Sequence, residues 1–219
     1  MSLGLNSYLS IFEYSPIKIE TVYDVGACNG WWYSGVRPFL PEANFFLFEA
    51  NPEYEEILKQ TGQRVFNKLL SNPGRGEVDF YNGTNTGDSY YKETTTIYDD
   101  KTSIKMPTVT LDELIEQNNL PIPQLLKLDT QGSELDILQG ATKLLGKTEL
   151  IVTEMPIIEY NKGAPNFSEY LNFFKSHDYI PVDVLEVHRG EETLIQLDML
   201  FVLRSAKYQV LGANREVRV

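Results

Sequence analysis

The chain has 219 residues, of which 42% are hydrophobic and 23% charged, enough for one domain with a sizeable core. Its formal net charge of −12 argues against a broad phosphate-binding surface, so we expect no nucleic-acid partner. The single cysteine excludes an intrachain disulfide, and no run approaches the ~18 apolar residues of a membrane-spanning helix. We therefore expect a cytoplasmic protein without membrane association.

The first segment, residues 1–18, is predicted to contain a leading helix. Leu5, Leu9 and Phe12 lie at helical spacing, and Pro16 follows as a stop. Such a helix would cover one side of a sheet.

A strand followed by a glycine turn comes next. The β-branched run 19–25 predicts the strand, and Gly26 and Gly30 follow it four residues apart, before a helix of about two turns that begins near Trp31. Glycines in such a turn let a ligand approach backbone N–H groups closely. In an open α/β sheet this turn lies at the carboxyl edge, where ligands bind.

The second strand is predicted over residues 44–49, which are almost wholly apolar and end in an acid. A strand that is apolar on both faces is typical of a central parallel sheet. Asn51 is expected to cap a helix with Pro52 at its first position, and residues 64–70 predict a third strand. The buried stripe of that helix is predicted to comprise Tyr54, Ile57 and Leu58.

Residues 71–106 break the regular pattern. They are rich in Gly, Asn, Thr, Asp and Tyr, with one alternating piece at 77–81. Too few apolar residues are present for a separate core, so we expect an excursion from one domain that spans residues 1–219. Residues 82–98 could cover the ligand as a lid with aromatic contacts; the alternative is a surface loop whose tyrosines pack on the sheet edge.

Regular elements resume in the second half of the chain. Thr110 and Glu113 have capping-box spacing, as do Asn166 and Glu169, so each pair predicts a helix start. Strands are expected at 125–129 and 150–154, and a helix between them that begins at Gly132. The buried faces of the two later helices are predicted to comprise Leu135, Leu138, Ala141 or Thr142 and Leu145, and Phe167, Leu171 and Phe174.

The last two strands decide the fold class. Residues 179–187 and 194–203 are joined only by 188–193, too short a link for the crossover between parallel neighbours, so they must form an antiparallel hairpin. Five β/α units and a hairpin match the seven-stranded, mostly parallel methyltransferase sheet rather than an all-parallel dinucleotide-binding sheet. Residues 205–219 are expected to form a C-terminal tail.

Acidic residues end four of the predicted strands: Asp24, Glu49, Asp129 and Glu154. Because the carboxyl ends of parallel strands lie along one edge, these acids should converge on one anionic crevice. Such a crevice suits a ligand with a cationic centre and a ribose diol but not a pyrophosphate. The turn is also G-x-x-x-G rather than the dinucleotide motif G-x-G-x-x-G. S-adenosylmethionine, with a sulfonium and no phosphate, fits better.

The sequence resembles the FkbM-type methyltransferases in four blocks. These are YDVGACNG at 23–30, FEANP at 48–52, VTLDEL at 109–114 and LKLDTQGSELDILQGA at 126–141. The resemblance implies a class I, Rossmann-like three-layer α/β sandwich, S-adenosylmethionine as methyl donor, and usually an oxygen acceptor on a sugar or another small metabolite. One departure is Cys28, because the family turn commonly has Asn at that position.

The resemblance also implies residue roles. Asp24 and the turn glycines would hold the methionine end, Glu49 the ribose, and Asp129 the amino group or the acceptor side. The alternatives are that Asp24 and Asp129 cap the following helices and that the glycines only make the turn. The predicted cofactor-binding residues are Asp24, Gly26, Ala27, Asn29, Gly30, Glu49, Ala50 and Asp129.

A hydroxyl acceptor must lose a proton, for which a positioned base is useful. The catalytic candidates are Glu154, at the end of the strand beside Asp129, Asp129 itself and His188; His177 is a weaker candidate. Glu154 could equally be a rim carboxylate that binds nothing. Asp129 and Glu154 could bind Mg²⁺ instead, but no third ligand appears at a helpful spacing, so no metal site is predicted.

Two rival functions remain open. An NAD-dependent oxidoreductase or epimerase shares the crevice and the ribose-binding acid, although the turn and the hairpin speak against it. A non-catalytic module would keep the fold without the donor site. The predicted partner is a small acceptor such as a sugar or glycosylated metabolite, bound by a monomer or homodimer.

Overall fold

The computed structural model describes residues 17–83, 87–95 and 102–206. Its centre is a sheet of seven strands: β1 (Thr21–Val25), β2 (Asn44–Glu49), β3 (Arg64–Asn67), β7 (Leu125–Leu128), β8 (Leu150–Pro156), β9 (Tyr179–Gly190) and β10 (Thr193–Leu203). Their order is β3-β2-β1-β7-β8-β10-β9. The five neighbouring strands β3, β2, β1, β7 and β8 are parallel, and β10 is antiparallel to both β8 and β9. The predicted mostly parallel sheet with a terminal hairpin is confirmed.

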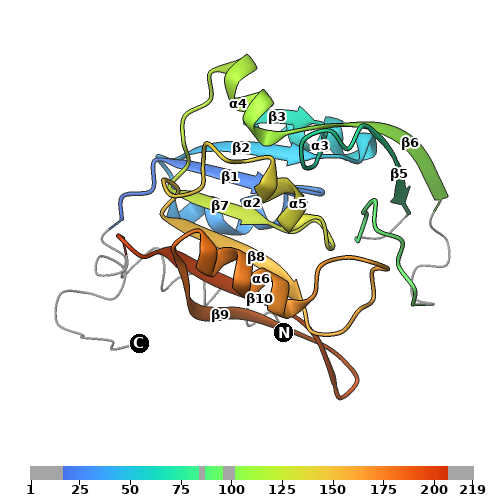
Figure 1. The fold of residues 1–219 in the computed structure, drawn as a ribbon. Coiled ribbons are helices and arrows are strands. Elements are labelled where there is room, and N and C mark those ends of the chain that lie inside the picture. The colour runs from blue at the N-terminus through green and yellow to red at the C-terminus, as the bar shows by residue number, and fades with distance from the viewer. Residues whose placement is uncertain (1–16, 84–86, 96–101, 207–219) are drawn as a thin grey trace.

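The helices are short and lie on both faces of this sheet. They are α2 (Trp31–Val36), α3 (Glu55–Lys59), α4 (Leu111–Asn118), α5 (Glu134–Gln139) and α6 (Phe167–Ser176), with 3₁₀ turns η1 (Arg37–Phe39) and η2 (Pro52–Tyr54). Figure 1 shows α6 in front of the sheet and α2 behind it, which gives three layers. None of the helices in the described part of the chain is both long and apolar enough to cross a membrane.

The central strands are buried because most of their side chains are apolar; the buried charged exceptions include Asp24 and Lys127. Every residue of β1 and β7 is buried, and β2 has the predicted bounds and only one exposed residue, Asn44. On one face of the sheet, Phe174 of α6 stacks on Phe201 of β10 with ring centroids 3.9 Å apart. The parallel pairing places the carboxyl ends of β3, β2, β1, β7 and β8 along one edge.

The prediction of one continuous third strand over residues 64–70 was wrong. β3 ends at Asn67, and the Lys68 N–H bonds to the carbonyl of Glu49, the last residue of β2. Since β2 offers nothing further to pair with, the chain continues into a second sheet of β4 (Leu69–Leu70), β6 (Thr102–Val109) and β5 (Glu77–Asn82), in that order. β6 was not predicted, because most of its side chains are exposed and it contains Pro107.

Three helix predictions need correction. In α3 only Leu58 is fully buried, and Ile57 is 46% exposed, because the helix has only five residues and covers the sheet with one turn. α5 ends at Gln139, so Leu145 lies in a following series of turns. In α6 the fully buried residues are Tyr170 and Phe174, whereas Phe167 and Leu171 are partly buried.

Both capping boxes are present. Thr110 and Glu113 exchange side-chain and backbone hydrogen bonds at the start of α4, and Asn166 and Glu169 do the same at α6. The leading helix within 1–18 was predicted over residues that lie outside the described part, apart from 17 and 18, and the tail from 207 onward also lies outside it.

Candidate functional site

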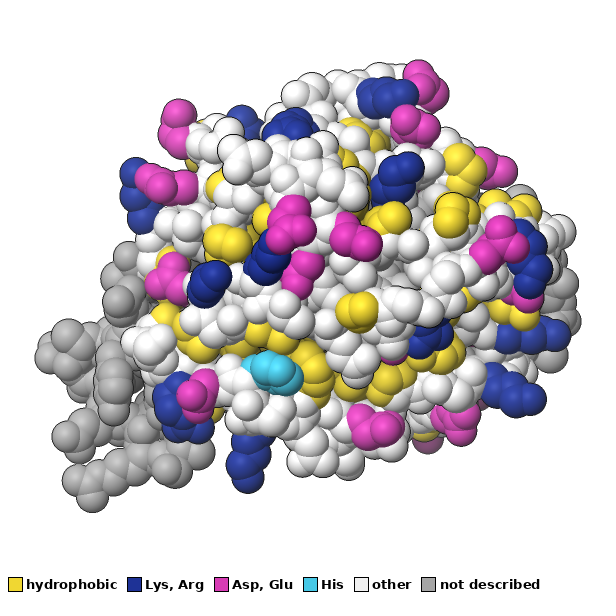
Figure 2. All heavy atoms as spheres, turned by 45° about the horizontal axis from the view of Figure 1, so that its top comes forward, with side chains coloured by type: hydrophobic (Ala, Val, Ile, Leu, Met, Phe, Trp, Pro, Cys, Tyr) yellow, Lys and Arg dark blue, Asp and Glu magenta, His cyan; other side chains and the backbone are white. Residues whose placement is uncertain are grey.

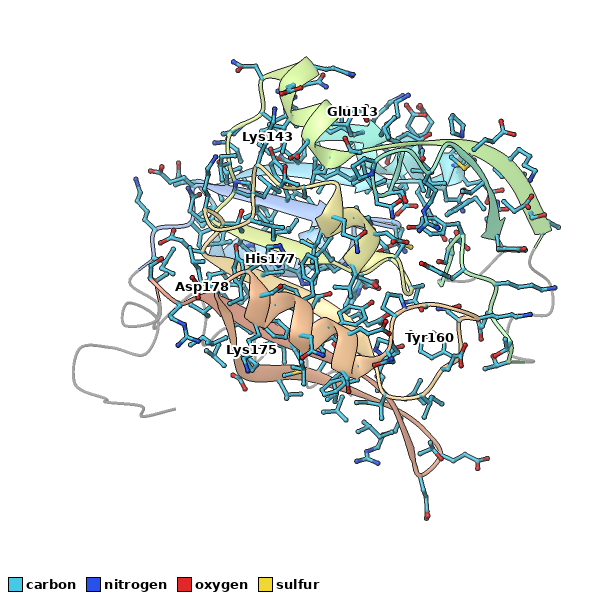
Figure 3. All side chains as sticks on the ribbon, in the orientation of Figure 1. Glu113, Lys143, Tyr160, Lys175, His177 and Asp178 are labelled. Carbon is cyan, nitrogen blue, oxygen red and sulfur yellow. The ribbon has the colours of Figure 1, made fainter. Side chains whose placement is uncertain are left out.

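A cavity of about 460 Å³ lies at the carboxyl ends of the parallel strands. Its walls come from the turn after β1, the ends of β2, β7 and β8, residues 87–95 of the excursion, and the β9–β10 hairpin. Figure 3 marks one side of this region with Tyr160, on the loop after β8, and shows His177 toward the other end of α6. The cavity brings together Glu49, Asp129, Glu154 and His188.

Glu49 is held rigidly at one end of the cavity. Its Oε2 atom accepts a hydrogen bond from the Cys28 N–H and its Oε1 atom one from the Asn51 N–H, both at 2.7 Å. Burial raises the pKa of Glu49 to about 7, and these two hydrogen bonds oppose the rise by stabilising the ionised form. Each oxygen keeps a second lone pair, so the carboxylate can accept two neighbouring hydroxyl groups.

The glycine turn joins β1 to its two neighbours. The N–H groups of Gly26 and Ala27 donate to the Phe48 carbonyl at 2.9 and 3.1 Å. A Cβ atom added at Gly26, whose φ is +78°, would lie 1.8 Å from the Asp129 carbonyl oxygen. Gly26 is therefore glycine because the ends of β1 and β7 approach closely there. This requirement comes from the fold itself.

The rest of the turn is also tied to the protein. Asn29 accepts a hydrogen bond from the Trp31 N–H at 3.1 Å, at the start of α2. Cys28 has a φ of +48°, a left-handed conformation that Asn adopts more readily than most residues. The left-handed backbone conformation therefore explains why the family turn commonly has Asn at this position. Gly26, Cys28 and Ala50 line the cavity, whereas Ala27, Asn29 and Gly30 are not among its lining residues.

Asp24 lies beneath the cavity rather than in its wall. The side chain is fully buried, and its Oδ1 atom is 3.4 Å from Nζ of Lys127, which in turn is 3.2 Å from Oδ2 of Asp129. Burial raises the pKa of Asp24, partly offset by Lys127. Burial lowers the pKa of Lys127, but the Asp129 and Asp24 carboxylates outweigh it and hold the ammonium charged. In this geometry Asp24 supports the site through Lys127.

The opposite end of the cavity is built around Glu154. The Gln131 amide donates to Glu154 at 2.7 Å and to Asp129 at 3.2 Å, and so bridges the two predicted catalytic acids. Gln196 donates to the other oxygen, Oε1, and the Tyr160 hydroxyl lies 3.4 Å from Oε2, the oxygen that Gln131 contacts. Burial, and then the nearby carboxylates, hold the pKa of Glu154 well above its ordinary value.

His188 reaches the same end from the hairpin. Its Nε2 atom lies 3.1 Å from Oδ1 of Asp198, and this hydrogen bond is the main cause that raises the pKa of His188. His177, the weaker candidate, does not line the cavity; its Nδ1 atom is 2.8 Å from the Phe173 carbonyl within α6. Of the two histidines, only His188 is positioned near the candidate acids.

Residues 87–95 belong to the described part of the predicted lid, and they form one wall of the cavity. Asp88 accepts a hydrogen bond from the buried Asn51 amide at 2.8 Å and lines the cavity. Tyr90 and Tyr91 donate to Asp136 of α5 at 2.8 and 2.7 Å. Their hydroxyls are therefore used to fix the wall. Residues 84–86 and 96–98 of the predicted lid lie outside the described part.

Several site residues were missed from the sequence. Tyr160, Gln196 and Asp198 lack a recognisable motif, since only strand register and loop geometry bring them to Glu154. Gln131 belongs to the block 126–141, but no role could be assigned to it from the sequence alone. Lys127 did carry a signal: a lysine stands inside an otherwise apolar strand that ends in an acid. A buried lysine requires a partner, and two acids end adjacent strands.

Two curated relatives share part of the sequence. "2-O-methyltransferase NoeI" of Sinorhizobium fredii is 26% identical over 186 residues, 73% of this chain and 72% of that protein. "Hexuronic acid methyltransferase AglP" of Haloferax volcanii is 26% identical over 119 residues, 52% of this chain and 48% of that protein. The match thus spans about half the length of the archaeal protein.

Solved structures agree on the fold. A methyltransferase FkbM from Methylobacillus flagellatus superposes with a TM-score of 0.53 and 16% identity, covering 84% of this chain and 43% of that one. An S-adenosylmethionine-dependent methyltransferase from Clostridium acetobutylicum superposes with a TM-score of 0.51 and 9% sequence identity. The match covers 92% of this chain and 91% of that one. The class I methyltransferase architecture is confirmed. The family model for the methyltransferase FkbM domain matches residues 24–181, so the chain belongs to the FkbM methyltransferase family.

Proposed function

We propose that this protein transfers a methyl group from S-adenosylmethionine to a hydroxyl oxygen of a sugar or another small metabolite. Family membership supports methyl transfer, and the functions named for the two relatives support a sugar acceptor. The observation that carries the proposal is Glu49, fixed by two backbone N–H groups in the same cavity as Glu154 and His188. One cavity thereby offers a diol-binding end and a proton-accepting end.

The residues present fit the donor. Glu49 would accept the ribose hydroxyls, and the apolar side chains of Phe48, Leu69 and Phe80 would contact the adenine. Asp129 would face the amino group or the acceptor side. Gly26, Ala27, Asn29 and Gly30 would act by shaping the turn, and Asp24 by holding Lys127 beneath it.

When bound, S-adenosylmethionine supplies an electrophilic methyl carbon. The protein's task is to align the acceptor oxygen with that carbon and to exclude water. The oxygen–carbon bond forms as the carbon–sulfur bond breaks, with its electron pair staying on sulfur. The hydroxyl proton passes to a base, for which Asp129, Glu154 and His188 are the candidates.

Calorimetric titration with S-adenosylhomocysteine tests the donor site. We expect the wild-type protein to bind it, and Glu49→Ala to weaken binding by ~1–3 kcal/mol, the scale for losing a charged hydrogen-bond partner. Glu56→Ala, at an exposed position of α3, is the matched control and should bind normally. Production of S-adenosylhomocysteine from S-adenosylmethionine with a panel of sugars then tests transfer.

Two outcomes would contradict the proposal. Binding and thermal stabilisation by NAD without any by S-adenosylhomocysteine would favour an oxidoreductase or epimerase. Absence of binding to either ligand would favour a non-catalytic module. Unchanged affinity in Glu49→Ala would move the ribose site elsewhere.

A further inference from the structure

Three side chains of metal-binding type meet at the end of the cavity opposite Glu49. They are Glu154 of β8, His188 of β9 and Asp198 of β10, and each offers one ligand atom within 4.8 Å of the other two. Glu154 and His188 line the cavity, and the Asp198 side chain is only 15% exposed. Two of the three residues therefore line the cavity, and the third, Asp198, lies beside them and is mostly buried.

The strand register explains why they converge. Asp198 lies directly opposite Glu154 on one side and opposite Glu186 on the other, and His188 lies opposite Gln196. Directly opposed residues of antiparallel strands point to the same face, and so do residues two apart in one strand. All of these side chains therefore project from one face of the sheet.

The spacing suits a shared cation. A divalent ion held at about 2.1 Å places adjacent ligand atoms about 3 Å apart and opposed ones about 4.2 Å apart. Nε2 of His188 and Oδ1 of Asp198 are 3.1 Å apart, which matches an adjacent pair. The two distances that involve the Glu154 oxygen are at most 4.8 Å, so the three side chains need to move only slightly closer together to hold one ion.

The surroundings support the same assignment. Gln131 and Gln196 each donate to a different Glu154 oxygen, which orients the carboxylate. Oε2 also lies 3.4 Å from the Tyr160 hydroxyl, so the lone pair offered to a cation is the second one of Oε1. Asp129 and Glu186 add negative charge nearby, and Lys127 is already shared between Asp24 and Asp129. A bound cation would balance these crowded carboxylates.

We propose that Glu154, His188 and Asp198 bind a divalent cation of the Mn²⁺ type, which takes both carboxylate and imidazole ligands. This deepens the proposed function and rests on it in one respect: the open coordination positions would hold hydroxyl oxygens of the acceptor. A cation at that place makes a hydroxyl more acidic. The proton then passes to Asp129, the oxygen forms its bond to the methyl carbon, and the carbon–sulfur electron pair stays on sulfur.

The test uses the full chain, stripped of metals with a chelator, and Mn²⁺ as the probe. Calorimetry and the electron paramagnetic resonance signal of free Mn²⁺ should show one bound ion. His188→Gln and Asp198→Asn should each weaken Mn²⁺ binding at least tenfold. Asp183→Asn, an exposed carboxylate on the same hairpin, is the matched control and should bind Mn²⁺ as the wild type does.

Binding of S-adenosylhomocysteine separates this proposal from the proposed function. All three variants should bind it with wild-type affinity, which also shows that they are folded. Mn²⁺ binding that is absent in the wild type, or unchanged in both cluster variants, would overturn the cation site while leaving methyl transfer intact. If Mn²⁺ binds, parallel titrations with Mg²⁺ and Zn²⁺ identify which of the three ions binds most tightly.

Discussion

Glu49 combines burial, fixed orientation and a raised pKa in one side chain. It is 7% exposed, both oxygens accept backbone hydrogen bonds, and the pKa of about 7 places its ionisation near neutral pH. Its protonation state therefore affects both folding and ligand binding within the usual working range.

We predict opposite effects of pH on stability and on ligand affinity. Between the ordinary pKa of 4.5 and about 7, the folded protein binds more protons at Glu49 than the unfolded chain. Raising the pH across that interval therefore lowers the contribution of Glu49 to the free energy of unfolding. The ionised carboxylate is the better acceptor for ribose hydroxyls, so S-adenosylhomocysteine should bind more tightly at about pH 8 than at about pH 6.

Denaturant unfolding and calorimetry across this pH range measure both effects. Glu49→Gln removes the titrating group, so the variant should lose this part of both pH dependences. The idea fails if the wild type and Glu49→Gln show the same pH profiles.

At the scale of elements, the second sheet and the wall of the cavity are fastened to α5 through Asp136. Oδ2 of Asp136 accepts hydrogen bonds from Arg75 at 2.6 Å, Tyr90 at 2.8 Å and Tyr91 at 2.7 Å, and Oδ1 accepts one from Asn72 at 3.2 Å. The carboxylate itself is buried. A single side chain thus joins segments that are distant in the sequence.

Asp136→Ala should lower the free energy of unfolding by about 3 kcal/mol, because it leaves several buried donors without an acceptor. Hydrogen exchange should also become faster in β5 and β6 than in the central sheet. Asp79→Ala, which removes an exposed ion pair with Lys105 in the same sheet, is the control and should cost about 0–1 kcal/mol. Equal losses in the two variants would show that Asp136 does not fasten the excursion.

Strands could be predicted from the sequence where both of their faces are buried. β1, β2 and β7 are mostly apolar and buried, and that pattern has few other structural solutions. β6 escaped prediction because its residues are held by pairing with β5 rather than by a buried face. The acids at strand ends could be found, since topology alone places them, but Asp198 could not, because it reaches Glu154 only through the register of β10.

At the scale of the whole molecule, negative charge dominates the cavity as it does the net charge of −12. The face in Figure 2 shows Lys and Arg side chains interspersed with Asp and Glu. Within the cavity the balance is different. The lining carboxylates are Glu49, Asp88, Glu93, Asp129 and Glu154, and Lys68 is the lining cation.

A neutral sugar should therefore be a better acceptor than a uronic acid. At low ionic strength, without added divalent cations, we expect about a tenfold lower kcat/KM for the uronic acid, because its carboxylate approaches like charges. The difference should shrink as salt screens the charges. Initial rates with a methyl glycoside and the matching uronic acid at two salt concentrations measure it. Faster transfer to the uronic acid would contradict the prediction and align this protein with its archaeal relative.

The hairpin has a consequence for how acceptor choice can change. Glu186, His188, Gln196 and Asp198 belong to one continuous stretch closed by the two-residue turn at Glu191 and Glu192, whereas the turn glycines and Glu49 come from the first strands of the chain. Under the proposed function, a mutation or exchange within that stretch would alter acceptor recognition while the proposed donor-binding residues stay in place. Relatives could thus diverge in substrate through a small, separable region while inheriting the same methyl donor.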